Sequence, residues 1–182
     1  VGGFLSQNAI TKKIEIDREE DAEEVEVEDE KIESFLHPDP FEIEIGYGLI
    51  PLVDASQGGN LLDRISTIRK SLAIELGMLI PPIRIRDNIQ LDSKKYIFKI
   101  HGIEIVSGDV MLDYYMVLNP DPDSNITGVD TIEPTFGLPA KWCTEEQKEI
   151  AEASGYTTVE PPAVIATHLM EVLRTHAYKL LD

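Results

Sequence analysis

Apolar and polar residues alternate in several short segments of the chain, and each such segment predicts a β-strand. Over residues 41–47, Phe41, Ile43 and Ile45 alternate with polar positions, which is typical of a strand with one buried face. His101-Gly102 is the signal of a tight hairpin between two further strands. Short apolar runs bounded by turn residues predict strands at residues 83–87, 96–100, 103–107, 114–118, 140–143 and 156–159.

Three other segments place apolar residues on one face of a helix. The clearest covers residues 61–78, with Asn60 as its N-cap and Gly77 able to end it. Residues 144–147 form a capping box in which the threonine caps a second helix and the glutamine reaches back. A double proline starts a third helix, over residues 161–181. Because strands and helices interleave, the sequence predicts a mixed α/β (α+β) fold.

Irregular segments separate these elements. Residues 119–130 are rich in Asn, Pro, Asp and Gly and are expected to form a surface loop. Residues 133–139 contain two prolines, which stiffen the backbone. Gly46-Tyr47-Gly48 lacks the third glycine of a dinucleotide-binding loop and is followed by Leu-Ile-Pro, so a structural turn is the preferred interpretation.

Acidic residues are concentrated near the start of the chain. Between Glu15 and Glu33, twelve acidic residues face two basic ones, a local balance of −10 within a net charge of −18. A segment so charged and without aromatic residues cannot bury enough apolar surface to fold, so residues 1–38 are expected to form a flexible acidic linker. The alternative is that Ile32, Phe35 and Leu36 form a short docking peptide before a proline break.

The composition excludes several classes of protein. A net charge of −18 argues against nucleic acid or an anionic membrane surface as the partner. No stretch approaches the roughly 20 apolar residues of a membrane-spanning helix. The single cysteine, Cys143, excludes an internal disulfide and a multi-cysteine zinc site. The chain starts without a signal peptide and stops within an expected helix, so we expect it to be a piece of a longer protein.

No arrangement of residues indicates catalysis, a metal ion or a cofactor. His168 and His176 are eight residues apart, too far for one metal ion on a straight helix, and His168 is interpreted as a hydrogen-bonded, half-buried side chain. Cys143 lies near a helix N-terminus, which could lower its pKa, but no base or orienting group is identified. A buried structural cysteine is the preferred interpretation, and we expect no enzymatic activity.

Two arginines on one strand form a first candidate surface. Arg84 and Arg86 alternate with isoleucines, so both face the same side of the strand. They are expected to form a surface salt-bridge network with acids such as Glu42 and Glu44. The alternative is a basic stripe that faces a partner.

A phenylalanine in the proline-stiffened segment forms a second candidate surface. Phe136 is hard to bury in a regular element there, and Glu133 places a charge three residues before it. A rigid aromatic side chain beside a charge is typical of binding hot spots. The alternative is that Phe136 caps the core, and the residues alone leave the two interpretations even.

A series of long, ordered motifs lies at residues 46–54, 61–65, 68–70, 81–88, 102–105, 108–109, 133–142 and 166–169. Together these motifs resemble the cytoplasmic domain of the FlhA family, the large export-gate proteins of flagellar type III secretion, with relatives in virulence injectisomes. The resemblance covers residues 41–182, and the GYGLIP and RIRDN segments favour the flagellar branch over an injectisome homologue in virulence-protein secretion.

This resemblance implies an architecture. It implies a multi-pass membrane protein at the bacterial inner membrane, whose cytoplasmic part has four subdomains and assembles as a nine-membered ring. Residues 1–38 would be the acidic linker to the last membrane helix. Residues 39–111 and 161–182 would form the first subdomain, with a thioredoxin-like layout, and residues 112–160 a small mixed α/β subdomain inserted in it.

The resemblance also implies a docking site. The family binds export chaperones carrying late substrates between the first two subdomains, through an acidic residue before proline, the phenylalanine of F-G-L and the threonine of A-T-H-L. These positions correspond to Glu133, Phe136 and Thr167. The resemblance therefore favours a binding anchor at Phe136. It implies neither catalysis nor a cofactor, because the ATPase of this system is a separate protein.

Three hypotheses about function are carried forward. The first is a docking module for export chaperones with their substrates, through the three residues named above. The second is a module for assembly of a homo-nonameric ring within the export apparatus, in which Ile32, Phe35 and Leu36 contact the neighbouring subunit. The third, a redox enzyme, is suggested only by the thioredoxin-like layout and lacks a C-x-x-C pair.

Overall fold

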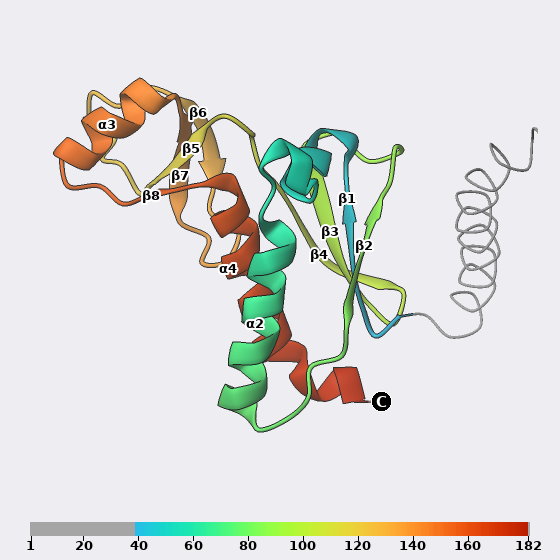
Figure 1. Ribbon diagram of the computed structural model, residues 1–182. Coiled ribbons are helices and arrows are strands. Elements are labelled where there is room, and N and C mark those ends of the chain that lie inside the picture. The colour runs from blue at the N-terminus through green and yellow to red at the C-terminus, as the bar shows by residue number, and fades with distance from the viewer. Residues whose placement is uncertain (1–38, 182) are drawn as a thin grey trace, which may run out of the picture. The chain divides into compact units, whose positions relative to one another are not determined.

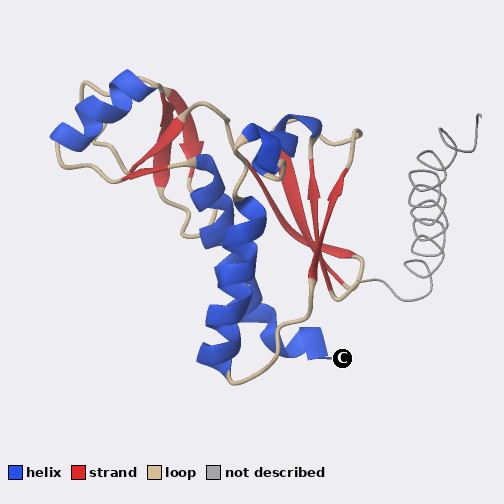
Figure 2. Ribbon diagram, viewed as in Figure 1, coloured by secondary structure: helices blue, strands red, loops and turns tan. Residues whose placement is uncertain are grey.

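Two four-stranded sheets and three α-helices make up the part of the chain that the structure, a computed structural model, describes, residues 39–181 (Figures 1 and 2). The mixed α/β prediction is confirmed. Within the described residues, no helix combines the length and the apolar character needed to cross a membrane.

The first sheet has the strand order β2-β1-β3-β4. β1 (Phe41–Ile45) is parallel to β2 (Ile83–Asp87) and antiparallel to β3 (Lys95–Ile100), which forms a hairpin with β4 (Ile103–Asp109). The apolar side chains of β1 are buried and its two glutamates are half-buried, as the alternation predicts. Both residues of the His101-Gly102 turn have positive φ, 50° and 80°, which confirms the tight hairpin.

Charged side chains pair across the strands of this sheet. The Nε atom of Arg86 lies 3.4 Å from Oε2 of Glu42, and Nζ of Lys99 lies 2.8 Å from Oε2 of Glu44. All four side chains are partly shielded from solvent. The structure therefore favours the salt-bridge interpretation of Arg86 over a basic stripe that waits for a partner.

The Gly46-Tyr47-Gly48 segment is a structural turn, as predicted. It leads from β1 into two 3-10 helices, η1 (Tyr47–Leu52) and η2 (Ala55–Gln57). A Cβ atom on Gly46 would lie 2.1 Å from the carbonyl oxygen of Asp92, so only glycine permits this approach of two backbone segments.

α2 (Leu61–Leu76) confirms the clearest helical pattern. Its buried residues are Leu61, Ile65, Ile68 and Leu72, and Gly77 ends it in the left-handed conformation. Asn60 occupies the N-cap position, but its Oδ1 accepts a hydrogen bond from Nε of Arg64 (3.2 Å) instead of from a helical N–H. The predicted capping interaction is therefore wrong, although the start of the helix is right.

α4 (Pro161–His176) lies beside α2 and continues into a last 3-10 helix, η3 (Ala177–Leu181) (Figure 1). Arg174 of α4 donates to both carboxylate oxygens of Glu75 of α2, at 2.9 and 3.2 Å. The buried face of α4 is apolar except for His168.

The second sheet is antiparallel throughout, with the order β6-β7-β5-β8. It consists of β5 (Tyr115–Leu118), β6 (Val129–Ile132), β7 (Pro139–Cys143) and β8 (Thr158–Val159). The sequence did not predict β6, because four residues after a loop rich in Gly, Asn and Asp carry too little periodicity.

α3 (Glu145–Ala153) follows β7 and begins as predicted. The hydroxyl of Thr144 accepts the N–H of Gln147 at 3.4 Å. The side chain of Gln147 does not return to its own cap; its Oε1 accepts the N–H of Thr127 at 3.1 Å and ties the surface loop to the helix. The predicted hydrogen bond from the Gln147 side chain back to its own helix cap is therefore wrong, because this side chain accepts the N–H of Thr127 in the nearby loop instead.

Alternation along the second sheet sends its side chains into two cores. Met116 and Trp142, which are opposite each other on β5 and β7, join the main core with the first sheet, α2 and α4. Val117 and Cys143 point the other way and join a small core with Ala151 of α3. The chain passes from one sheet to the other close to the predicted boundaries at residues 111–112 and 160–161. Because the two sheets share a core, the division into subdomains and the thioredoxin-like layout stay predictions.

Candidate functional site

The loop between β6 and β7 is a turn closed by its own first residue. The carboxylate of Glu133 accepts the backbone N–H of Thr135 at 2.8 Å and that of Phe136 at 2.7 Å. The carbonyl oxygen of Glu133 accepts the N–H of Gly137 at 2.9 Å. The backbone N–H of Glu133 donates to the carbonyl oxygen of Leu138 at 2.8 Å. Four hydrogen bonds from one residue therefore fix the backbone of this loop.

The side chain of Glu133 is 5% exposed. The sequence places the charge of Glu133 three residues before Phe136, and the structure buries that charge beneath the loop. The carboxylate turns inward because the two N–H groups of the loop provide the partners that a buried carboxylate requires. Glu133 thus shapes the site, whereas its charge is not displayed on the surface.

Phe136 is 68% exposed, which rules out a role as a cap of the core. Two further apolar side chains are exposed. Ile132, at the end of β6, is 60% exposed, and Leu138, directly before β7, is 38% exposed. Large apolar side chains on both sides of a fixed turn are typical of a binding surface. We call the segment from Ile132 to Leu138 the Phe136 loop.

Thr167 is exposed on α4, next to the buried His168. The loop after β6 runs beside α4 in Figure 1, and Glu133 is close enough to raise the pKa of His168. The buried Glu133 of the Phe136 loop therefore lies near the buried His168 of α4. Phe136 and Thr167 both face solvent.

A hollow of about 450 Å³ is lined in part by Ala166, the residue that precedes Thr167. It is bounded by the first turns of α2 and by α4, and its lining residues are Asn60, Asp63, Arg64, Thr67, Ile68 and Ala166. No local sequence pattern signals this hollow, because it depends on how two helices that are far apart in the chain lie side by side.

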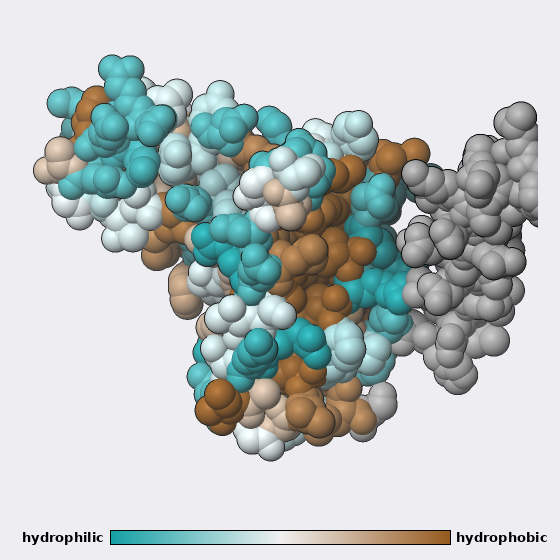
Figure 3. Space-filling model, viewed as in Figure 1, coloured by the Kyte–Doolittle hydropathy of each residue, from teal (hydrophilic) through white to brown (hydrophobic). Residues whose placement is uncertain are grey.

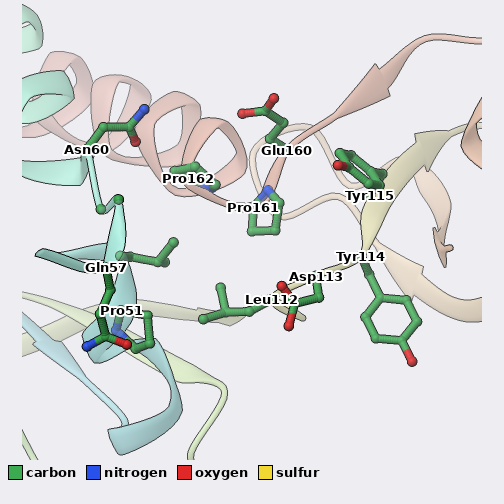
Figure 4. A pocket seen from close by; sticks show the side chains of 13 residues that line it. Pro51, Gln57, Asn60, Leu112, Asp113, Tyr114, Tyr115, Glu160, Pro161 and Pro162 are labelled. Atoms are coloured by element: carbon green, nitrogen blue, oxygen red, sulfur yellow. The ribbon is translucent and has the colours of Figure 1, made fainter. Parts of the chain in front are cut away.

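Figure 4 shows another hollow, of about 360 Å³, at the start of both helices and of β5. Its wall carries two carboxylates, those of Asp113 and Glu160, and the latter lies 3.7 Å from Arg64. Asp113 has φ 66°, an uncommon conformation for a residue other than glycine. The carboxylates make this hollow polar, in contrast with the surface around Phe136.

Apolar surface also gathers between α2 and the first sheet on the face shown in Figure 3. There, a third hollow of about 340 Å³ is lined by Ile45, Ile50, Val53, Leu62, Ile85 and Asp87. Leu62 follows the same helical period as Leu61 and Ile65, but it is 53% exposed and does not belong to the buried face of α2.

His168 confirms the interpretation as a hydrogen-bonded histidine. Its Nδ1 lies 2.7 Å from the hydroxyl of Tyr96, and the ring is 3% exposed, more deeply buried than expected. Burial lowers the pKa of His168, and the nearby Glu133 carboxylate raises it in part. The lowered pKa favours the neutral form of the ring at neutral pH.

Cys143 is buried, as expected. Burial raises the pKa of its thiol, and Lys141 opposes this shift. The low pKa that a helix N-terminus could give is absent, because desolvation is the largest influence here. Among the described residues, no three His, Cys, Asp or Glu side chains are placed to hold a metal ion. Ile32, Phe35 and Leu36 lie outside the described residues.

Comparison with known proteins decides the family. The profile of the FHIPEP family matches residues 2–182. The chain belongs to the FHIPEP family. Among its relatives, the flagellar biosynthesis protein FlhA of Bacillus subtilis is 47% identical over 184 residues, which cover 99% of this chain and 27% of the relative. FlhA of Treponema pallidum is 49% identical over 144 residues, 79% of this chain and 20% of that protein. The chain thus spans about a quarter of the FHIPEP proteins that it matches.

Solved structures confirm the fold of this FHIPEP chain. The CdsV protein of Chlamydia pneumoniae matches with a TM-score of 0.66 at 23% identity, over 79% of this chain and 44% of that one. CdsV in complex with CdsO matches with a TM-score of 0.63 at 23% identity, over 79% and 46%. The nonameric SctV-C of EPEC matches with a TM-score of 0.51 at 12% identity, over 79% and 42%.

Proposed function

We propose that this chain is a non-catalytic docking module of a flagellar type III protein-export gate, at the cytoplasmic face of the bacterial inner membrane. Its docking site consists of the Phe136 loop and the exposed Thr167, and its ligands are export chaperones carrying late substrates. The flagellar assignment rests on 47% identity to a flagellar biosynthesis protein, against 23% to CdsV.

The exposed ring of Phe136 on a fixed turn is the observation that carries the proposal. An aromatic side chain adds a large contact area at a small cost in side-chain entropy. The four hydrogen bonds of Glu133 order the backbone before any partner arrives. A partner therefore does not have to supply the free energy of ordering the loop.

The surroundings of Phe136 suit an apolar partner surface with a polar rim. Ile132 and Leu138 extend the apolar area, and the exposed Thr167 on α4 offers a hydroxyl group for a hydrogen bond. Glu133 contributes indirectly, as the residue that shapes the loop.

Isothermal titration calorimetry with a flagellar chaperone–substrate complex tests the site. Replacing a hot-spot aromatic costs 2 kcal/mol or more, so Phe136→Ala is expected to weaken binding by about 30-fold. Ile74→Ala is the matched control, because Ile74 is an apolar side chain 85% exposed on α2, away from the loop. Equal affinities for wild type and Phe136→Ala would refute the site.

Ring assembly is a second candidate function. The structural neighbour SctV-C is nonameric, and the apolar hollow lined by Ile50, Val53 and Leu62 leaves surface for a subunit contact. The expectation for Ile32, Phe35 and Leu36 belongs to this proposal. Native mass spectrometry of the full-length protein with all three replaced by alanine tests it: loss of the nonamer supports their role, and an intact nonamer contradicts it.

A further inference from the structure

β6 is an edge strand of the second sheet, and it ends in the Phe136 loop. In the part of the chain that the structure describes, β7 is the only strand that pairs with it. Val129 and Ile132 are 52% and 60% exposed, and the side chain of Asp130 is 89% exposed. The outer side of β6 is therefore open to solvent.

The register of β6 on β7 shows which backbone groups face this open side. In an antiparallel pair, the N–H and C=O groups of successive residues point alternately towards the partner strand and away from it. The N–H of Glu133 donates to the carbonyl oxygen of Leu138, so the backbone of Glu133 faces the β7 side. By this alternation Thr131 also faces β7, whereas Asp130 and Ile132 face outwards.

A second hydrogen bond agrees with this alternation. Pro139 is opposite Ile132 in the register, but its carbonyl oxygen accepts the N–H of Asn119, which follows β5, at 2.7 Å. Proline has no N–H, so neither backbone group of Pro139 is directed at Ile132. The N–H and C=O groups of Asp130 and Ile132 are therefore four hydrogen-bonding groups on the open side of the sheet. An extended backbone is the ligand that can pair with all four.

The other edge strands are less suited to pairing with a further strand. β8 consists of two residues. The register between β3 and β4 shifts at Phe98 and Lys99, and such irregularities protect an edge. β2 carries Arg84 and Arg86 among its five residues, and charged side chains have the same protective effect. β6 is also the edge strand that leads into the Phe136 loop.

We propose that an extended peptide segment of the chaperone–substrate complex pairs with β6 as an added antiparallel strand, next to Phe136. This mode of binding rests on the proposed function, because it describes how the same partner is held. The antiparallel direction follows the second sheet, in which every pair of strands is antiparallel.

The side chains of β6 define the chemistry of this segment. The carboxylate of Asp130 is exposed, although its Oδ1 lies 3.7 Å from Nζ of Lys141, and it selects a basic residue opposite it. Ile132 lies on the same face of the sheet, two positions along the strand, and selects an apolar residue. The net charge of −18 also favours a basic segment. The ligand therefore has an apolar and a basic residue two positions apart in an extended conformation.

Amide hydrogen exchange of the whole chain, measured by nuclear magnetic resonance, tests the added strand. In the free chain, the Thr131 amide is expected to exchange slowly and the amides of Asp130 and Ile132 rapidly. A flagellar chaperone–substrate complex is expected to slow exchange at Asp130 and Ile132 at least tenfold. Unchanged exchange at both residues in the complex would overturn the added strand. Slowing in the chain alone as its concentration rises would also overturn it, because a second copy of the chain would then occupy the edge.

Two replacements of Asp130 separate its backbone from its side chain. Asp130→Pro removes an outward N–H, which an edge strand tolerates, and is expected to weaken binding of the chaperone–substrate complex about tenfold. Asp130→Ala keeps this N–H and is expected to weaken binding less than about threefold. Slow exchange of the Thr131 amide shows that the proline variant is folded. Equal affinities of the two folded variants would contradict strand pairing.

Phe136→Ala distinguishes failure of the added strand from failure of the docking site. If Phe136→Ala weakens binding while the outward amides of β6 exchange freely in the wild-type complex, the docking site stands and the added strand is wrong. If Phe136→Ala binds normally while these amides are slowed, the partner binds through β6 and the docking role of Phe136 fails.

Discussion

The carboxylate of Glu133 accepts the backbone N–H of Phe136 at 2.7 Å, so a buried acid fixes the backbone from which an exposed ring projects. The two residues have separate tasks. Phe136 supplies the contact area, and Glu133 supplies the order that makes this area available to a partner.

Glu133→Ala is expected to destabilise the loop without removing the aromatic ring. It leaves the N–H groups of Thr135 and Phe136 without their carboxylate, at a cost of about 2 kcal/mol in the free energy of unfolding. Urea denaturation followed by circular dichroism measures this cost. Glu152→Ala, at an exposed acid of α3, is the control; an equal, small effect of both replacements would contradict the structural role of Glu133.

The stability of the protein is expected to fall as the pH falls below the ordinary histidine pKa of about 6.5. Burial lowers the pKa of His168 in the folded state, so the unfolded chain binds more protons in this range. The stabilisation is complete above the unfolded pKa and is lost towards lower pH, by up to about 1.4 kcal/mol per pH unit.

Denaturation at several pH values between about 5.5 and 7.5 tests this dependence on the histidine pKa. His168→Gln is expected to remove part of the slope. A slope that is the same in wild type and His168→Gln would show that another group is responsible.

Gly108→Ala is expected to destabilise the first sheet. The new Cβ atom would lie 2.3 Å from the hydroxyl of the buried Tyr96, and overpacking of this kind costs about 1–3 kcal/mol. Thermal unfolding gives the comparison, with Ser107→Ala on the same strand as the control. A melting temperature equal to that of the control would mean that Tyr96 can move away at little cost.

Cys143 is expected to react slowly with a thiol reagent. Its thiol is buried and its raised pKa keeps it protonated, so labelling with Ellman's reagent at pH 8 should be on the order of 100-fold slower in the folded chain than in urea. Fast labelling of the folded protein would indicate an activated thiol and would contradict the proposal of a non-catalytic module.

The sequence predicted elements wherever one repeating pattern determines the structure. The period of residues 61–78 predicted α2, and alternation predicted β1 and β2. Interactions between residues that are far apart in the chain could not be predicted from the sequence. Gln147 was assigned to its own helix cap, but a loop donor at Thr127 lies closer in space. Tyr96 and His168 are separated by 72 residues, so no local pattern reports their hydrogen bond.

The candidate site shows the same division. Two prolines predicted a stiff segment. The residues alone left open whether Phe136 is exposed or caps the core, and in the structure its ring is exposed. The inward orientation of Glu133 was not predicted, because a charged residue in a loop is usually solvated. Only the closure of the turn, with its two N–H donors, allows the carboxylate to lie inside.

The most direct test of the docking proposal is site-specific photo-crosslinking at Phe136. With p-benzoyl-phenylalanine at this position, illumination in the presence of a flagellar chaperone–substrate complex is expected to give a covalent adduct with the chaperone. The same group at Ile74, which is at least as exposed on α2, is expected to give none. Adducts from Ile74 alone, or from neither position while the complex is bound, would contradict the docking site at the Phe136 loop.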